Sequence, residues 1–284
     1  MKNILITGSN GFIGRNLYER LILEKETKVY CVDTKKIKRK NYVNCNLSSY
    51  KSTVDIIKKI QPNEIYNMAG SFTNSYKKDF KNNFIISKNI LDAVKFLKKK
   101  VRVLLVGSAS EYGNVSSFDN PIKEHQKLNP YNIYGFSKSL QSNLMNLYCN
   151  LYGLDIVMGR PFNIYGNGIS KSLLPGKIYE EINNFKKGKI KKIELGNLDS
   201  VRDYIHIDLV IDQLIRVMKF GHNNETYNIG TGKPQTTESF LKKILKSQEL
   251  SFEIIKITKK KYKSIDPSVI YADINKINKL RNKK

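Results

Sequence analysis

Apolar residues from the start of the chain to about residue 160 fall into two alternating patterns. Short runs are apolar almost throughout, which is typical of parallel strands covered on both faces. Between them lie longer segments in which apolar residues recur every three or four positions, the period of an amphipathic helix. The predicted strands span residues 3–7, 28–33, 64–68, 101–106 and 155–158, and the predicted helices span residues 12–23, 52–60, 83–98 and 134–151.

Strands that alternate with helices at this spacing indicate an α/β protein with a doubly wound parallel sheet of the Rossmann type. After residue 160 the rhythm loosens, and glycine-asparagine pairs separate shorter elements. This change predicts a smaller second lobe. We therefore expect residues 1–160 to form the sheet domain and residues 161–284 to form mainly the smaller lobe, interleaved with the first.

The turn between the first strand and the first helix is rich in glycine. Gly8, Gly11 and Gly14 allow a tight turn and a close approach of a pyrophosphate to the N–H groups that begin the helix. An acidic residue, Asp33, ends the second strand 19 residues after Gly14, where its carboxylate can accept hydrogen bonds from a ribose. This combination predicts a dinucleotide-binding site.

Asp33 also bears on which dinucleotide binds. Its carboxylate accepts from the 2′-hydroxyl of NAD and repels the 2′-phosphate of NADP. Thr34, Lys35 and Lys36 follow directly and offer a hydroxyl and positive charge to such a phosphate. Exposed lysines are flexible and screened, so we expect NAD(H) to be preferred, with NADP(H) as the alternative.

The charge of the chain is strongly positive, at +25 from 50 Lys and Arg against 25 Asp and Glu. The lysines are spread along the sequence rather than gathered in one arm. This favours a solvated lysine-rich surface, or steering of a small anionic substrate, over a nucleic-acid site. We expect neither nucleic acid nor membrane as a partner.

Other parts of the composition point to a reducing compartment. The three cysteines are an odd number and lack the spacing of metal ligands, so no metal is expected. The N-terminus lacks the features of a signal peptide, and no apolar run is long enough to cross a membrane. A cytoplasmic location is expected.

Candidate acid–base chemistry lies at the start of the long helix near residue 134. Tyr134 and Lys138 are four residues apart and so share one helix face. An ammonium group close to a phenol lowers its pKa toward the pH at which acid–base catalysis is efficient. Ser108 and Ser110 supply hydroxyls after the strand at 101–106.

Six segments together carry a resemblance to a known family. They are TGSNGFIG (7–14), NMAG (67–70), SASEYG (108–113), YGFSK (134–138), RPFN (160–163) and RDYIH (202–206). From residue 2 to about residue 280 the chain resembles the extended short-chain dehydrogenases/reductases, which include nucleotide-sugar epimerases, dehydratases and reductases. The resemblance implies that Ser108 holds the reacting oxygen, Tyr134 exchanges its proton, and Lys138 also holds the nicotinamide ribose.

The resemblance also implies which residues contact the two ligands. The expected cofactor residues are Gly8, Asn10, Gly11, Phe12, Ile13, Gly14, Asp33, Asn46, Leu47, Met68, Ala69, Gly70, Tyr134, Lys138 and Pro161. The expected residues for a nucleotide-sugar substrate are Ser110, Glu111, Asn163, Arg202 and Lys263. For Arg202, whose planar guanidinium suits a diphosphate, a structural ion pair with Asp203 is the alternative. A homodimer built on the helices at 83–98 and 134–151 is also implied.

The placement of Glu111 bears on the reaction. Dehydratases of the family usually carry a glutamate three residues before the motif glycine, whereas Glu111 lies two before Gly113. A shift of one residue turns a side chain to the opposite face, which disfavours elimination of water. The phrase GNLDSVRD (196–203) is most like GDP-mannose dehydratases and GDP-6-deoxymannose reductases.

We therefore expect an NAD-dependent enzyme that interconverts the 4-hydroxyl and 4-keto forms of a nucleotide sugar. The resemblance favours a GDP-linked hexose, 6-deoxyhexose or heptose used in cell-surface polysaccharide synthesis. The alternatives are a 4-epimerase with tightly held NAD, and then a 4,6-dehydratase or a non-catalytic binder of nucleotides or nucleic acid.

Overall fold

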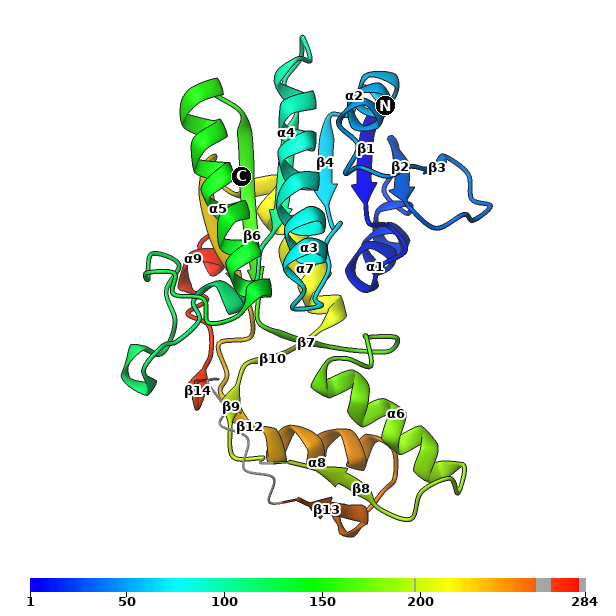
Figure 1. Ribbon diagram of the computed structural model, residues 1–284, viewed down its shortest axis with the longest axis vertical. Coiled ribbons are helices and arrows are strands. Elements are labelled where there is room, and N and C mark those ends of the chain that lie inside the picture. The colour runs from blue at the N-terminus through cyan, green and yellow to red at the C-terminus, as the bar shows by residue number, and fades with distance from the viewer. Residues whose placement is uncertain (197, 259–266, 281–284) are drawn as a thin grey trace.

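Seven parallel strands form the central sheet of the computed structural model, which describes residues 1–196, 198–258 and 267–280 (Figure 1). The order across the sheet is β11-β6-β5-β4-β1-β2-β3. The strands are β1 (Lys2–Thr7), β2 (Thr27–Asp33), β3 (Tyr42–Asn44), β4 (Glu64–Asn67), β5 (Arg102–Val106), β6 (Asp155–Pro161) and β11 (Glu225–Ile229). The predicted doubly wound parallel sheet is confirmed.

Alternate residues of each strand enter two separate cores, one on each face of the sheet. In β1, Ile4 and Ile6 belong to one apolar cluster and Leu5 to the other. The first cluster is completed by helices α1 (Phe12–Leu21) and α7 (Ile207–Phe220), and the second by α2 (Tyr50–Ile60), α4 (Ile86–Lys95) and α5 (Ile133–Tyr152). Because both faces are covered, the strands are apolar throughout, as the sequence pattern predicts.

Two strands of the sheet are not apparent in the sequence pattern. Strand β3 has only three residues, too few to show a period. Strand β11 carries polar Thr226 and Asn228, yet both are buried because β11 pairs with β6. Since β11 follows α7 in the chain, residues beyond 161 return to the central sheet before the smaller lobe is completed.

The segment before α4 also differs from the prediction of one helix over 83–98. A short helix α3 (Tyr76–Asp79) runs into a π-helical turn (Phe80–Ile85), and regular α-helix begins only at Ile86. Asn83 in this turn is buried, and its amide donates to the carbonyl of Ser71 and to the hydroxyl of Ser137. The apolar periodicity predicts an ordinary helix over this segment because it does not register these polar contacts.

The smaller lobe lies below the sheet in Figure 1 and has a core of its own. Its centre is Phe240, which stacks on Tyr204 with ring centroids 3.8 Å apart. The lobe and the segments that join it to the sheet comprise β7 (Asn163–Tyr165), α6 (Leu174–Lys186), β8 (Ile193–Leu195), β9 (Val201–Arg202), β10 (Tyr204–His206), β12 (Gln235–Thr236), α8 (Thr237–Ser247), β13 (Ile255–Ile257) and β14 (Val269–Ile270). Helix α9 (Asn275–Asn278) returns to the sheet, where it packs on β11. In the described part of the chain, 3₁₀ turns span Ala109–Glu111 and Ser117–Asp119 after β5, and Phe252–Ile254 after α8.

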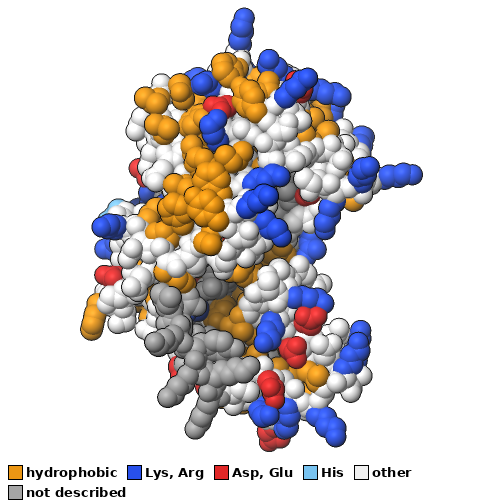
Figure 2. Space-filling view, viewed as in Figure 1, with side chains coloured by type: hydrophobic (Ala, Val, Ile, Leu, Met, Phe, Trp, Pro, Cys, Tyr) orange, Lys and Arg blue, Asp and Glu red, His pale blue; other side chains and the backbone are white. Residues whose placement is uncertain are grey.

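The surface is basic over both lobes and partly apolar on one face. Figure 2 shows lysine and arginine side chains distributed over both lobes, and hydrophobic side chains gathered over the face where α4 and α5 lie in Figure 1. No helix in the described part of the chain has the length and apolarity needed to span a bilayer. Within the same residues, no cluster of His, Cys, Asp or Glu has the make-up of a metal site.

Candidate active site

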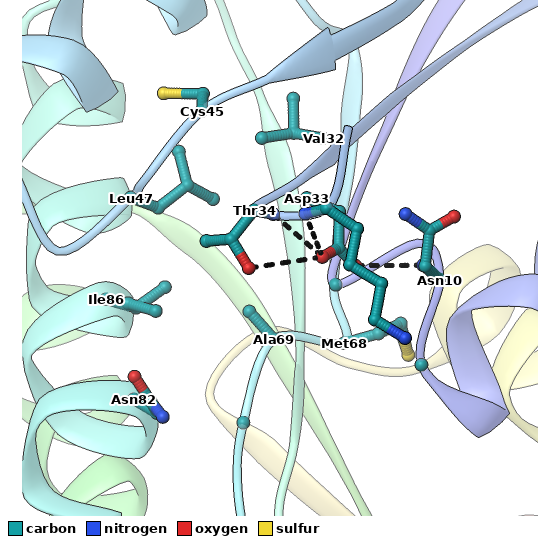
Figure 3. Close-up of a pocket in the computed structure, with 14 residues that line it drawn as sticks. Asn10, Val32, Asp33, Thr34, Cys45, Leu47, Met68, Ala69, Asn82 and Ile86 are labelled. Atoms are coloured by element: carbon teal, nitrogen blue, oxygen red, sulfur yellow. Dashed lines mark hydrogen bonds between the residues drawn. The ribbon is translucent and has the colours of Figure 1, made fainter. Parts of the chain in front are cut away.

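A pocket of about 260 Å³ opens where the carboxyl ends of β1, β2 and β4 meet (Figure 3). Eight of the fifteen residues expected at the cofactor line it: Gly8, Asn10, Gly11, Asp33, Leu47, Met68, Ala69 and Gly70. Six residues outside that expected set also line it: Val32, Thr34, Lys35, Cys45, Asn82 and Ile86. Thr34 and Lys35 adjoin Asp33 in the sequence. Asn82 lies in the π-helical turn and Ile86 begins α4, and neither carries a sequence signal.

The glycine loop has the shape of a phosphate cradle. Gly8 has a left-handed φ of +58°, and a Cβ there would lie 2.7 Å from the backbone nitrogen of Ala69. A Cβ on Gly14 would lie 2.2 Å from the carbonyl oxygen of Gly8, so only glycine lets α1 approach the loop this closely. Helix α1 has no side-chain cap, so no side chain occupies the N–H groups of its first turn, which includes Phe12 and Ile13. These features fit a bound pyrophosphate.

The carboxylate of Asp33 is held in the wall of the pocket by backbone donors. Its Oδ2 accepts from the N–H of Asn10 at 2.9 Å, which links β2 to the glycine loop. Its Oδ1 accepts from the N–H groups of Thr34 at 2.7 Å and Lys35 at 3.3 Å, as Figure 3 shows. The carboxylate therefore has a fixed position beside the site that we expect a ribose to occupy.

One end of the pocket is mainly apolar and suits an adenine ring. Val32, Cys45, Leu47 and Ile86 line it, in the arrangement drawn in Figure 3. Asn46, expected to contact the cofactor, does not line this pocket. Its Oδ1 accepts from the N–H and the hydroxyl of Ser48, so it closes the local turn instead.

The other end of the pocket leads to the expected catalytic residues. A Cβ on Gly70 would lie 3.4 Å from Nζ of Lys138. Tyr134 and Lys138 lie in the first two turns of α5, which Asn132 caps by accepting from the N–H of Gly135 at 2.7 Å. The hydroxyl of Ser108 lies close enough to the phenol of Tyr134 to lower its pKa. The structure thus brings the three residues together at the end of β5.

The charge states of this trio differ from the sequence prediction. Burial raises the pKa of Tyr134 to about 12, and the nearby side chain of Ser108 offsets only part of this effect. The ammonium of Lys138, predicted to lower the phenol pKa, donates instead to the carbonyl of Val106 at 2.7 Å and to Gln141 at 3.3 Å. Burial lowers the pKa of Lys138 to about 8. At neutral pH Tyr134 is therefore a protonated phenol, suited to donate a proton.

A loop after β4 packs against Tyr134. The Phe72 ring meets the ring of Tyr134 edge-on at 4.7 Å, and Asn74 accepts from the N–H of Tyr134 at 3.3 Å. The buried carboxylate of Asp79 holds this loop through Ser71 and Thr73. The loop therefore positions Tyr134 and leaves an aromatic ring, 40% exposed, beside it.

Glu111 does not lie where a substrate contact is expected. Its side chain is fully buried and forms an ion pair with Arg160, whose Nε lies 3.0 Å from Oε2. Its Oε1 accepts from the N–H of Ser108 at 2.7 Å, and Ser142 donates to Oε2. The prediction that Glu111 binds substrate is therefore wrong, because both carboxylate oxygens are occupied inside the protein.

The remaining expected residues that the structure describes lie at or near the junction with the smaller lobe. Arg202 donates to the carbonyls of Val201 and Ser268, while the buried carboxylate of Asp203 accepts from Thr231 and its neighbours. The alternative of an ion pair between Arg202 and Asp203 is thus not what the structure shows.

Three further expected residues complete the junction. Asn163 begins β7, with its N–H donating to the carbonyl of Asp203, and the buried Pro161 ends β6. Ser110 is half-buried in the turn after β5, and its N–H donates to the hydroxyl of Ser108. Lys263 lies outside the described residues.

Comparison with known proteins gives a consistent result. Residues 4–230 match the NAD dependent epimerase/dehydratase family. Over 233 residues the chain is 32% identical to a GDP-6-deoxy-D-talose 4-dehydrogenase from Aggregatibacter actinomycetemcomitans, a match that covers 81% of this chain and 74% of that protein.

Two solved structures share the fold. One is RMD from Pseudomonas aeruginosa complexed with NADPH, with a TM-score of 0.84 and 20% identity over 98% of this chain and 91% of that one. The other is UDP-glucose 4-epimerase from Thermus thermophilus complexed with NAD, with a TM-score of 0.84 and 20% identity over 99% of this chain and 94% of that one.

The position of Asp33 predicts the preference between cofactors. The native protein should bind NAD(H) more tightly than NADP(H) by roughly tenfold or more, because the fixed carboxylate repels a 2′-phosphate. Asp33→Ala should narrow this ratio, while Lys36→Ala serves as a control at an exposed position outside the pocket wall. Titration calorimetry at matched salt measures both ratios. Tighter binding of NADP(H) by the native protein would show that the lysines dominate.

The lowered pKa of Lys138 predicts a pH-dependent cost to stability. Between about pH 8 and the ordinary lysine value of 10.5 the unfolded chain binds more protons, so the unfolding free energy rises with pH in this window. Lys138→Met lacks this contribution. Its stability relative to the native protein should be greater at about pH 7 than at about pH 10 by roughly 2 kcal/mol.

Urea unfolding at the two pH values measures the difference. Lys59→Met, at an exposed position near the end of α2, is the matched control and should show no such change. An equal difference for both variants would mean that the burial of Lys138 carries no electrostatic cost.

Proposed function

The chain belongs to the NAD dependent epimerase/dehydratase family, and from this membership we propose that it interconverts the 4-hydroxyl and 4-keto forms of a GDP-linked 6-deoxyhexose. It is an NAD-dependent nucleotide-sugar oxidoreductase of the short-chain dehydrogenase type. The finer assignment is supported by the 32% identical relative, a GDP-6-deoxy-D-talose 4-dehydrogenase. Such a product would serve cell-surface polysaccharide synthesis.

The observation that carries the proposal is that Ser108, Tyr134 and Lys138 gather at the end of β5, where Nζ of Lys138 lies near Gly70 of the dinucleotide pocket. Two hydroxyls at one point can both hydrogen-bond the oxygen on a sugar carbon whose hydrogen faces the pocket. The nicotinamide, when bound, supplies or accepts the hydride at that carbon. Ser108 then holds the oxygen while Tyr134 moves its proton.

The charge states suit Tyr134 to act as the acid when a ketone is reduced. A phenol with a pKa of about 12 is protonated at neutral pH and gives its proton to the developing alkoxide. Lys138, with a pKa of about 8, is mainly protonated at the same pH and adds a positive charge next to Gly70 at the end of the pocket. In the reverse direction, Tyr134 must first lose its proton, so oxidation gains from higher pH.

Glu111 supports a 4-oxidoreductase over a 4,6-dehydratase. Elimination of water from a sugar requires an acid and a base that reach neighbouring carbons. The carboxylate of Glu111 is buried and paired with Arg160, so it is not placed to serve as either group.

We assign the nucleotide-sugar site to the junction between the sheet edge and the smaller lobe, with residues 161–284 contributing most of it. Arg202 is held there by carbonyls, so its remaining guanidinium donors suit a diphosphate. Asn163 and Ser110 would contact the same ligand. The net charge of +25 would raise the encounter rate of this anionic substrate.

We also propose that two copies associate through α4 and α5. Helix α5 carries an exposed apolar strip near its carboxyl end, and the ammonium of Lys95 on α4 lies over the rings of both Phe96 and Tyr152. The exposed members of the strip are Leu147, Leu151 and Tyr152. A second copy that covers this hydrophobic face of Figure 2 would remove it from water.

The activity is tested by mixing the purified protein with GDP-6-deoxy-D-talose and NAD, or with the matching 4-keto sugar and NADH, and following the reduced nicotinamide. We expect stoichiometric cofactor turnover, and Tyr134→Phe should lower kcat by roughly 10²–10⁴-fold with little change in cofactor affinity. Formation of the 4-epimer without net cofactor change would instead establish an epimerase. No turnover in either assay would overturn the proposal.

Arg202→Ala should weaken nucleotide-sugar binding rather than slow the chemical step. The contact with a diphosphate is the same in the ground state and the transition state, so KM should rise roughly tenfold or more while kcat stays within a few-fold. Arg216→Ala, on α7, is the control. If KM is unchanged and only kcat falls, Arg202 does not hold the diphosphate.

Leu151→Glu should convert a dimer into monomers. A charge on the exposed apolar strip of α5 would have to be desolvated in the interface, which costs far more than the lost apolar contact. Light scattering at micromolar concentration compares this variant with the native protein and with Ile257→Glu, an exposed apolar site in the smaller lobe. A native protein that is already monomeric would refute the dimer.

A further inference from the structure

Behind the catalytic trio lies a closed network of buried polar side chains. Glu111 is fully buried, and Arg160 is only 4% exposed. Arg160 donates through Nε to Glu111 at 3.0 Å and through Nη2 to the hydroxyl of Ser142 at 2.9 Å, while Ser142 donates to Glu111. Each member of this triangle is therefore hydrogen-bonded to the other two.

The network joins elements that are far apart in the chain. Glu111 belongs to the turn after β5, Ser142 lies one turn beyond Lys138 on α5, and Arg160 lies in β6. The triangle therefore fixes the turn that carries Ser108 against the helix that carries Tyr134. The relative position of this turn and this helix determines how close the hydroxyls of Ser108 and Tyr134 lie to each other.

The link to Ser108 is direct. Oε1 of Glu111 accepts from the N–H of Ser108 at 2.7 Å, while the hydroxyl of Ser108 accepts from the N–H of Ser110 at 3.2 Å. The side chain of Ser108 thus caps the turn from one side and Glu111 caps it from the other. Loss of the Glu111 contact would free the backbone of Ser108 to rotate.

Gly107 shows that the chain makes room for this carboxylate. A Cβ at Gly107 would lie 2.3 Å from Oε1 of Glu111 and 3.0 Å from Cγ of Arg160. A larger residue at position 107 would therefore displace the carboxylate from the N–H of Ser108. The buried carboxylate of Glu111 therefore requires glycine at position 107.

We propose that Glu111 is a positioning residue for the proposed 4-oxidoreduction, and that, held by Arg160 and Ser142, it fixes the backbone of Ser108 and so keeps the Ser108 hydroxyl beside Tyr134. The proposal rests on the proposed function only for the identity of the reaction. A purely structural role accounts for less, because a buried ion pair stabilises a fold little more than well-packed apolar residues do. What apolar residues cannot supply is an acceptor for the N–H of Ser108.

The charge of Glu111 has a second effect on the trio. It raises the pKa of Lys138, as the buried Asp79 does from the loop side, and so opposes the effect of burial. The other groups on Lys138, the carbonyl of Val106 and the amide of Gln141, are uncharged. Removal of Glu111 should therefore shift the pH limb of activity that depends on the Lys138 ammonium to lower pH.

The test is a kinetic double-mutant cycle. The paired change Glu111→Leu with Arg160→Met removes both charges together, which avoids leaving one buried charge unpaired. We expect kcat to fall by about 10²-fold, the usual effect of a small misplacement, with KM and cofactor affinity within a few-fold of native. Combined with Ser108→Ala, the paired change should cost little more than Ser108→Ala alone. Additive losses, or an unchanged kcat, would overturn the proposal.

Two single variants support the cycle should the paired change prevent folding. Gly107→Ala keeps both charges but displaces the carboxylate, and it should lower kcat in the same way. Tyr112→Phe removes a hydroxyl that donates to Asn228 and contacts Arg160 but does not touch Glu111. It should lower the melting temperature and leave kcat unchanged. If Gly107→Ala and Tyr112→Phe have equal effects on kcat, the network has only a structural role.

A crystal structure of the paired variant separates this proposal from the proposed function. If the native protein turns over none of the sugars, the proposed function fails. The position of Ser108 in the variant crystal structure still tests the positioning role of Glu111. We expect its hydroxyl to leave the phenol of Tyr134 in the variant. A hydroxyl that keeps its native position would overturn the positioning role.

Discussion

The parallel direction of all seven central strands brings their carboxyl ends to one edge of the sheet, and the candidate site is assembled from residues at and just beyond those ends. Gly8 comes after β1, Asp33 ends β2, Met68 comes after β4 and Ser108 lies two residues beyond β5. Each of these strands contributes one of these residues, and the order of the strands in the sheet sets the order of the residues along the edge. The candidate dinucleotide pocket and the trio of Ser108, Tyr134 and Lys138 are adjacent because β4 and β5 are adjacent.

The same edge gathers polar groups that the interior of a protein normally excludes. Lys138, Glu111, Arg160 and Asp79 are all buried within a few elements of one another. Two apolar cores, one on each face of the sheet, offset the free-energy cost of this arrangement. Placing Lys138 where burial lowers its pKa to about 8 costs stability, while the nearby carboxylates of Glu111 and Asp79 favour its positive charge. Stability and chemistry therefore make opposing demands at this edge.

Interleaving of the two lobes ties the proposed substrate site to the same sheet. The chain leaves β6, passes through β7, α6 and β9 in the smaller lobe, and returns by α7 to β11 before it completes that lobe. Arg202 is held by the carbonyls of Val201 and Ser268, the second of which comes from the last part of the chain. Segments that are remote in sequence thus build the junction between the lobes together.

Some of this architecture is predictable from the amino-acid sequence because it depends on local spacing. Continuous apolar runs determined most strands, the glycines at 8, 11 and 14 determined the loop, and the four-residue interval placed Tyr134 and Lys138 on one helix face. The tertiary structure decided whatever depends on distant neighbours. In the folded protein β11 pairs with β6 and is buried, and Asn82 and Ile86 line the pocket. Asn46 instead hydrogen-bonds Ser48 within its local turn.

Glu111 and Tyr134 show the physical reason. Position in the motif suggested that Glu111 meets a substrate and that Lys138 lowers the pKa of Tyr134. Packing brought Arg160 and Ser142 to Glu111 from β6 and α5, and gave the ammonium of Lys138 the carbonyl of Val106 as its partner. Sequence spacing determines which side chains share a helix face or a strand end. Burial and hydrogen-bond partners, which decide charge and role, exist only once remote segments have packed together.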